Sequence, residues 1–165
     1  MGQELSVSAN FADYLAGGTL NMEAAYGFAR HWTVSAGAKY NPFSFQGGYG
    51  EVLLRQRSVS AGLRWWPWHI YSGWWMGSKL QYQEFAQGGL SGPQTTEGDR
   101  YGAGLSAGYS AMLGKHFNLD IGLGVWGGYS IYSAYACQKC GRRIDSGSRF
   151  FVLPNDYLIA VSYIF

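Results

Sequence analysis

The chain has 165 residues, of which 25 are glycine, 18% are aromatic and only 13% are charged. A typical soluble domain has about 25% charged residues and about 7% glycine, so this composition argues against an ordinary water-soluble enzyme domain. The net charge of +2 is too small to indicate nucleic-acid binding, and an apolar fraction of 47% excludes an intrinsically disordered chain. The length fits a single domain over residues 1–165.

The sequence shows neither the pattern of a membrane-spanning helix nor that of a signal peptide. A membrane-spanning helix needs about 20 consecutive, mostly apolar residues, whereas the apolar runs here are as short as Leu158–Val161. Met1-Gly2-Gln3-Glu4 has neither the basic nor the apolar region of a signal peptide. We interpret Met1-Gly2 as the start left after a leader has been removed, with Gln3 near the mature N-terminus.

Apolar and small or polar residues alternate along the chain with a period of two, which predicts β-strands. In the first segment, for example, Leu5 and Val7 alternate with Ser6 and Ser8. In chain order the alternating segments cover residues 4–11, 20–28, 32–40, 58–65, 74–82, 101–113, 117–125 and 157–165. Strands of about 9 to 11 residues have the length that crosses the hydrocarbon core of a bilayer at a tilt.

The two alternating sets differ in chemistry. The apolar set carries no charge within the segments, and its aromatic residues lie near segment ends, as the aromatic girdles of a membrane barrel require. The other set holds the charges, which are Glu4, Glu23, Lys39, Arg64, Lys79 and Asp120. Because three are acidic and three are basic, a closed interior could satisfy them in pairs. Eight strands enclose a lumen that side chains just fill, so Glu23, Lys39, Arg64, Lys79 and Asp120 predict a packed polar network and no pore.

The connections alternate between short and long. Short ones follow the second, fourth and sixth segments, a modest one covers residues 12–18, and long ones cover about 41–56, 84–99 and 127–156. Short turns on one side and long loops on the other are typical of outer-membrane barrels. We therefore predict an all-β fold, an eight-stranded antiparallel transmembrane β-barrel in the outer membrane of a Gram-negative bacterium. Its even strand number places both termini in the periplasm and the long loops outside the cell.

A soluble eight-stranded barrel of lipocalin type is the alternative, because it shows the same alternation. Its apolar face would point inward, and its exterior would carry too few charges for a soluble surface. The C-terminus favours the membrane barrel: Ile159, Val161, Tyr163 and Phe165 alternate up to the last residue. This ending resembles the C-terminal signal of substrates of the barrel-assembly machinery, which we expect as a partner during insertion.

Cys137 and Cys140 are the only cysteines and lie in the last predicted loop. Cys-x-x-Cys-Gly resembles half of a zinc ribbon, but zinc needs two more ligands. His31, His69 and His116 all fall in the short turns, at the opposite end of a barrel. We therefore expect no metal site within the chain and a local disulfide in an oxidising envelope. Free thiols and a metal shared with a partner are the alternatives.

Basic residues gather in the same loop, namely Lys139, Arg142, Arg143 and Arg149. Arginine matches phosphate with a bidentate fork, and Arg57 could snorkel to the same headgroups. These residues are candidate contacts to lipid phosphates, lipopolysaccharide or a ligand, and a solvated loop surface is the alternative.

No arrangement of residues indicates catalysis. The predicted outer side has no histidine to act as general base, and Glu51, Glu84 and Asp99 are paired with no activated nucleophile. We therefore expect neither an enzyme nor a cofactor. Trp65-Trp66-Pro67-Trp68 and Trp74-Trp75 flank one short turn, which a girdle explains; an aromatic docking surface for another envelope protein is the alternative.

Several short motifs carry a family resemblance. They are Asn21-Met22-Glu23, Trp32-Thr33-Val34, Tyr40-Asn41-Pro42-Phe43, Arg64-Trp65-Trp66, Cys137-Gln138-Lys139-Cys140-Gly141 and Tyr163-Ile164-Phe165. The chain resembles a family of small, uncharacterised Bacteroidota outer-membrane proteins, a domain of unknown function. The resemblance implies an eight-stranded barrel, often encoded near fimbrial or surface-assembly genes, and it brings no catalytic residues.

The expected function follows from the predicted location. We expect a non-enzymatic integral barrel that is a structural or accessory component of a larger envelope or surface-assembly complex, bound to another envelope protein. The alternative is a surface binding module whose long loops engage lipopolysaccharide or an external ligand.

Overall fold

The computed structural model describes residues 5–15, 18–47, 50–89, 92–137 and 141–165. These residues form an all-β structure with one short helix. The strands are β1 (Leu5–Asn10), β2 (Leu20–Ala29), β3 (Trp32–Asn41), β4 (Ser44–Gly47), β5 (Gly50–Trp65), β6 (Gly73–Gly88), β7 (Thr95–Met112), β8 (Phe117–Tyr135) and β9 (Arg143–Ile164), and α1 (Phe11–Leu15) follows β1. Within the described part of the chain, no helix has the length and apolar character of a membrane span.

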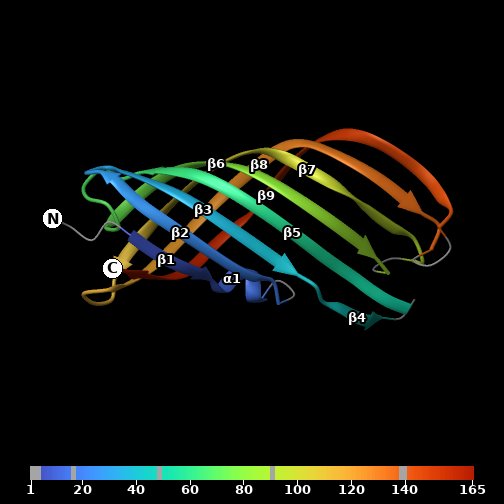
Figure 1. The fold of residues 1–165 in the computed structure, drawn as a ribbon, viewed down its shortest axis with the longest axis horizontal. Helices are drawn as coiled ribbons and strands as arrows, with labels where there is room; N and C mark the ends of the chain where they lie inside the picture. The colour runs from blue at the N-terminus through green and yellow to red at the C-terminus, as the bar shows by residue number, and fades with distance from the viewer. Residues whose placement is uncertain (1–4, 16–17, 48–49, 90–91, 138–140) are drawn as a thin grey trace.

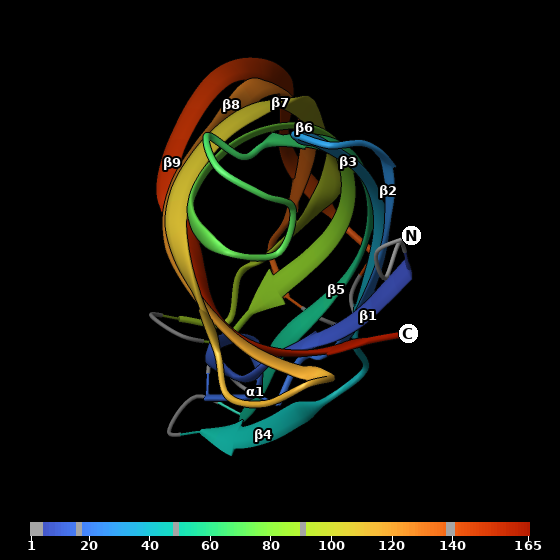
Figure 2. The ribbon, with the colours of Figure 1, turned by 90° about the vertical axis from the view of Figure 1, so that its left-hand side faces the viewer.

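Eight strands close into a ring (Figures 1 and 2). The ladder runs β1-β2-β3-β5-β6-β7-β8-β9 with antiparallel neighbours, and β9 pairs with β1 to complete it. β4 stands outside the ring and pairs only with the beginning of β5. The ladder of β3 stops at Asn41 because the next residue, Pro42, has no N–H to donate.

The two ends of the ring differ (Figure 1). The turn end carries both termini and the connections β2–β3, β5–β6 and β7–β8. At the other, open end, the strands β5 to β9 extend beyond β1, β2 and β3, since they have 16 to 22 residues against 6 to 10. We call these projecting parts of β5 to β9 the extended sheet.

The extended sheet occupies much of the sequence where long loops are predicted. Of the predicted loops 41–56, 84–99 and 127–156, large parts are strand. Pairs such as Gln87↔Thr96 and Glu97↔Ser133 continue the backbone ladder after the apolar alternation has stopped. Hydrophobic alternation therefore marks only the part of each strand whose outward face is apolar.

The interior of the ring is polar and its outer face is apolar. On β3, Thr33 and Ser35 are buried, whereas Trp32, Val34 and Tyr40 are exposed. The same alternation holds in the other ring strands, where large exposed side chains such as Leu80, Leu105 and Leu123 point away from the ring. The prediction that the apolar set of the ring strands faces outward is confirmed, which differs from the inward-facing apolar set expected of a lipocalin-type barrel.

A β-bulge in β9 resets its alternation. Gly124 pairs with Asp156, but Trp126 pairs with Leu153, so two residues, including Pro154, have no partners on β8. Val152 is exposed before the bulge and Tyr157 after it. In β9, even-numbered residues thus face outward before the bulge and odd-numbered residues after it. This change explains why the predicted eighth alternating segment begins only at residue 157.

Candidate functional site

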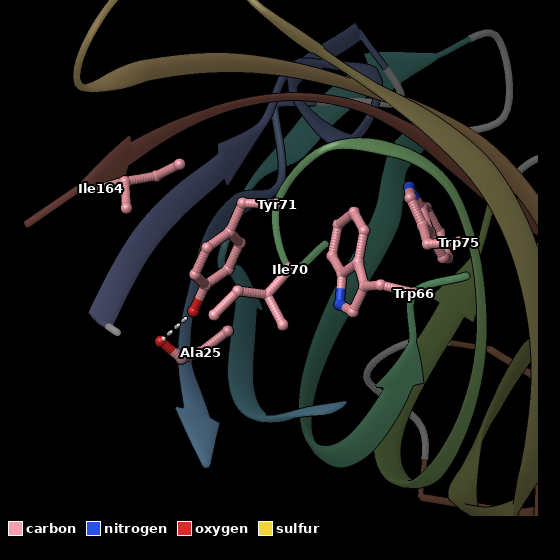
Figure 3. Close-up of a cluster of buried hydrophobic side chains, with 6 residues drawn as sticks. All are labelled: Ala25, Trp66, Ile70, Tyr71, Trp75 and Ile164. Atoms are coloured by element: carbon pink, nitrogen blue, oxygen red, sulfur yellow. Dashed lines mark hydrogen bonds between the residues drawn. The ribbon is translucent and has the colours of Figure 1, made fainter. Parts of the chain in front are cut away.

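The connection between β5 and β6 folds back into the ring and closes the turn end. Figure 2 looks at this end and shows the green connection inside the ring. Its side chains form a buried cluster with three strand residues (Figure 3), and the members are Ala25, Trp66, Ile70, Tyr71, Trp75 and Ile164. We call this cluster the tryptophan plug. The sequence pattern predicts a short turn with girdle tryptophans for this segment. Trp66 and Trp75, at 1% and 2% exposure, belong instead to the core.

Hydrogen bonds fix the plug to the wall of the ring. The Trp66 indole N–H donates to Thr33 Oγ1 at 3.1 Å, and the Tyr71 hydroxyl donates to the Ala25 carbonyl at 3.1 Å (Figure 3). Burial raises the pKa of the Tyr71 phenol, so this group stays neutral and keeps its proton for that bond. Trp66 and Tyr71 therefore tie the plug to the strands β3 and β2 through satisfied polar groups.

Glycines on two strands make room for Trp75. A Cβ built on Gly122 would lie 2.8 Å from Cζ2 of Trp75, and one built on Gly108 would lie 2.5 Å from the same atom. Both contacts are closer than real Cβ atoms tolerate, so only glycine fits under the indole ring. Two glycines of β7 and β8 thus make room for the plug.

Three ion pairs fill the middle of the ring. Arg64 binds Glu23, Lys39 Nζ lies 2.9 Å from Asp13 Oδ2, and Lys79 Nζ lies 2.6 Å from Asp156 Oδ2. The structure thus brings the predicted residues Glu23, Lys39, Arg64 and Lys79 into one interior. Sequence analysis missed both aspartates, because Asp13 is placed by α1 and Asp156 by the β9 bulge.

Two predicted interior charges are not among these pairs: Glu4 lies outside the described residues, and Asp120 is held differently. Its carboxylate is 4% exposed and accepts hydrogen bonds from the hydroxyls of Ser110 and Ser162. Among the described residues it makes no ion pair, so the expected pairing with a basic residue is not seen. Nearby, the Asn118 amide donates to the Tyr71 carbonyl, which links this polar cluster to the tryptophan plug.

The ion-paired region surrounds a cavity of about 80 Å³ lined by residues that include Glu23, Arg64, Trp75 and Lys79. The Trp75 Nε1 has no hydrogen-bond partner among the described protein atoms. A water molecule in the cavity would accept its proton, since buried polar groups are generally satisfied by protein or water.

A second polar network joins β3, β5 and β6 toward the open end. The Asn41 amide donates to Thr19 Oγ1 at 3.1 Å, Gln56 donates to the same oxygen at 3.2 Å, and Gln83 donates to Gln56 at 2.7 Å. Thr19 and Asn41 are 1% and 3% exposed, so these groups are tightly packed. The ion pairs of the interior thus lie between the tryptophan plug at the turn end and this polar network toward the open end.

Exposed aromatic side chains form two sets on the outward face. The strand register aligns the first set, Tyr82, Tyr101, Tyr129 and Phe150, in one row across β6 to β9. We call this the outer aromatic row. The second set lies toward the turn end: Trp32 pairs with Trp65, and the rings of Trp74 and Tyr109 lie 5.4 Å apart. We call these four the turn-end aromatic set.

Charged side chains stand immediately beyond the outer aromatic row. The register places Arg57, Glu84 and Asp99 in the next outward row toward the open end. Arg57 Nε lies 2.7 Å from Glu84 Oε2, and the Tyr82 hydroxyl donates to Asp99 at 3.1 Å. The predicted lipid contact Arg57 is therefore outward-facing and bound to a carboxylate.

The basic residues of the last predicted loop are spread over β9 and the connection before it. Arg142 and Arg143 are exposed, and the guanidinium of Arg149 lies 5.4 Å from the Tyr132 ring centre. Lys139 lies outside the described residues. Cys137 is disulfide-bonded, but Cys140 also lies outside the described residues, so the pairing of the two stays a prediction.

The C-terminal strand residues continue the outward apolar face. Ile159, Tyr163 and Phe165 are exposed and Val161 is half-buried. The Tyr163 ring contacts Phe117 at 5.1 Å and Phe165 at 4.9 Å between ring centres. Their role as an assembly signal is a property of the unfolded chain and stays a prediction.

Each of the three histidines forms a hydrogen bond to a backbone carbonyl at the turn end. Nδ1 of His31 lies 2.8 Å from the Trp66 carbonyl, Nδ1 of His69 lies 3.1 Å from that of Ile70, and Nδ1 of His116 lies 2.9 Å from that of Ile164. A carbonyl only accepts, so each Nδ1 donates its proton. In the part of the chain that the structure describes, no three His, Cys, Asp or Glu side chains form a group that could hold a metal ion.

The fold and interior define the class of protein: an all-β chain whose closed antiparallel ring of eight strands is polar and ion-paired inside and apolar outside. The chain belongs to the family of proteins of unknown function DUF3575, whose model matches residues 1–165. A search of curated proteins finds no match.

Proposed function

We propose that this protein is a non-enzymatic integral barrel of the Gram-negative outer membrane. The observation that carries the proposal is an uncharged apolar band between the outer aromatic row and the turn-end aromatic set. On β6 the outward residues from Trp74 to Tyr82 are Met76, Ser78 and Leu80, and on β7 those from Tyr109 to Tyr101 are Ala107, Leu105 and Ala103. Water would be a poor solvent for such a face, and lipid a good one.

The height of the band supports the same conclusion. Trp74 and Tyr82 are eight residues apart, which is about 26 Å along a strand. A tilt of 35–45° reduces this to about 20 Å, before side-chain length is added, against an apolar height of about 25 Å in outer-membrane barrels. The charged row of Arg57, Glu84 and Asp99 then lies at the headgroup level of the outer leaflet, and both termini lie on the periplasmic side.

The closed interior supports a structural or accessory role. The tryptophan plug, three ion pairs and the Thr19 network fill the ring, so we propose neither a pore nor a catalytic site. Function is then left to outer surfaces and to the extended sheet. We propose that the barrel is a component of a larger envelope or surface assembly, bound to another envelope protein; its Bacteroidota origin stays a prediction.

A surface binding module is the second candidate. The observation that favours it is the extended sheet, which projects past the ring and presents arginines on its inner face. In this second candidate function, the extended sheet takes the place of the predicted long loops and engages lipopolysaccharide or an external ligand.

Gel mobility of detergent-extracted protein, unboiled against boiled, tests the membrane proposal. We expect a heat-dependent shift and co-fractionation with outer membranes, and a further effect of reductant if Cys137 pairs with Cys140. A protein that stays folded and dissolved in plain buffer would overturn the proposal. The accessory role has its own test: a barrel that leaves native membranes without any co-purifying envelope protein contradicts it.

A further inference from the structure

Two arginines share one row on the inner face of the extended sheet. Arg100 on β7 pairs with Ser130 on β8, and Ser130 pairs with Arg149 on β9. Directly paired residues project to the same face of a sheet, and Ser130 is 2% exposed, which places all three side chains on the inner face. Adjacent strands lie about 4.8 Å apart, so the two arginine Cα atoms are about 10 Å apart.

Aromatic rings hold both guanidinium groups. Arg100 Cζ lies 3.9 Å from the Phe85 ring centre and 5.8 Å from that of Phe151, and Arg149 Cζ lies 5.4 Å from the Tyr132 ring centre. Such contacts attract the cation to the face of the ring and use none of its five N–H donors. Both arginines are therefore positioned with donor capacity to spare.

Neither arginine is ion-paired to an acidic side chain of the described residues. The interior cations Lys39, Arg64 and Lys79 are each bound to a carboxylate. By contrast, within the described residues no Asp or Glu forms an ion pair with Arg100 or Arg149. The two like charges also repel each other across Ser130. Two neighbouring cations without a counter-charge are stabilised when an anion binds between them.

We propose that Arg100 and Arg149 bind a phosphate monoester group. A phosphate dianion matches two positive charges, and its three terminal oxygens accept hydrogen bonds from two bidentate forks. A carboxylate has one charge and two oxygens, so a single arginine would satisfy it. The site faces the inside of the extended sheet and not the apolar band, which favours a soluble phosphate ester over a lipid headgroup. It needs no contact with lipid and so goes beyond the proposed function.

Calorimetric titration of the folded, full-length protein in detergent tests this site. The probes are inorganic phosphate, glucose 6-phosphate and dihexanoyl phosphatidic acid, each against a sodium chloride blank. The decisive variant is Arg149→Gln, because Arg149 is exposed and we expect the fold to tolerate its loss; Arg100→Gln is the second. Arg57→Gln is the matched control, since Arg57 lies on the outward face and is bound to Glu84.

We expect Arg149→Gln and Arg100→Gln each to weaken phosphate binding by about tenfold or more, and Arg57→Gln to leave it unchanged. Arginine-dependent binding of both soluble phosphates supports a soluble ligand. The same dependence for dihexanoyl phosphatidic acid alone supports the phosphate site and assigns it to a lipid headgroup. Absence of binding by all three probes, or equal binding by Arg149→Gln and wild type, would overturn the proposal. Solubility without detergent would contradict the membrane proposal alone and leave this titration readable.

Discussion

Lys79 and Asp156 form an ion pair across the interior, with 2.6 Å between Nζ and Oδ2, and they join β6 to β9, strands that are not neighbours in the ring. Their side chains are only 18% and 19% exposed. A partner that loses its opposite charge in such a place keeps most of its desolvation cost.

Lys79→Met and Asp156→Asn should therefore each lower the free energy of unfolding by about 2 to 3 kcal/mol, somewhat less than for a fully buried pair. The double variant should lose less than the sum of the two, because it leaves no unpaired charge. The free energy of unfolding of all three variants is measured by urea titration, with the intensity of the folded band in unboiled gels as the folded fraction. Arg57→Gln is the control, since the Arg57–Glu84 pair is exposed and should contribute less than about 1 kcal/mol. Additive losses in the double variant would show that the pair is not coupled.

Leu105 lies in the middle of the apolar band and is 67% exposed. If lipid covers this face, Leu105→Arg should cost about 2 to 4 kcal/mol and reduce the folded fraction in outer membranes. Ile144→Arg is the matched control, because Ile144 is also exposed, at 47%, but stands on the extended sheet beyond the outer aromatic row. Equal tolerance of both substitutions would contradict a lipid-covered band.

Gly122 should be irreplaceable while Trp75 is present. Gly122→Ala places a Cβ 2.8 Å from the indole and should cost about 1 to 3 kcal/mol through overpacking. Gly114→Ala is the control, since a Cβ there meets nothing within 4 Å. In a double-mutant cycle with Trp75→Ala, the cost of Gly122→Ala should shrink. If it does not, the glycine is required for a reason other than the tryptophan plug.

The raised pKa of Tyr71 predicts a loss of stability in alkali. Burial is the main cause of the shift, and the ordinary value is 10.0. Below about pH 10 the phenol is neutral in both folded and unfolded chains, so its contribution is fully present. Above that pH the unfolded chain loses the proton first, and stability falls until the folded-state pKa is passed.

Tyr71→Phe should remove this part of the alkaline loss while costing about 1 kcal/mol at neutral pH through the lost hydrogen bond to Ala25. Unfolding of both proteins between pH 8 and 11 checks this, and parallel pH profiles would contradict it.

The family and the strand pattern of the ring agree with the predictions made from the sequence. The extended sheet at the open end does not follow from the sequence. Hydrophobic alternation identifies β2 and β3 nearly to the residue, because the outward residues of both strands are apolar along their whole length. It misses the outer parts of β5 to β9, where the ladder continues although the regular alternation of apolar and polar residues does not. Arg100 escapes notice for the same reason: it lies one residue before the predicted sixth segment.

The sequence by itself determined which side chains face outward, because a period of two is a local property that every strand carries within itself. Only the tertiary structure decided the partners inside the ring. Asp13 reaches Lys39, and Asp156 reaches Lys79, through ring closure, a short helix and a bulge that rephases β9. Likewise, Trp66 enters the core and Trp65 stays outside, although they are neighbours in sequence, because the connection after β5 folds inward. Pairing across a closed ring depends on register and on backbone direction, and neither is written in the alternation of residues along one strand.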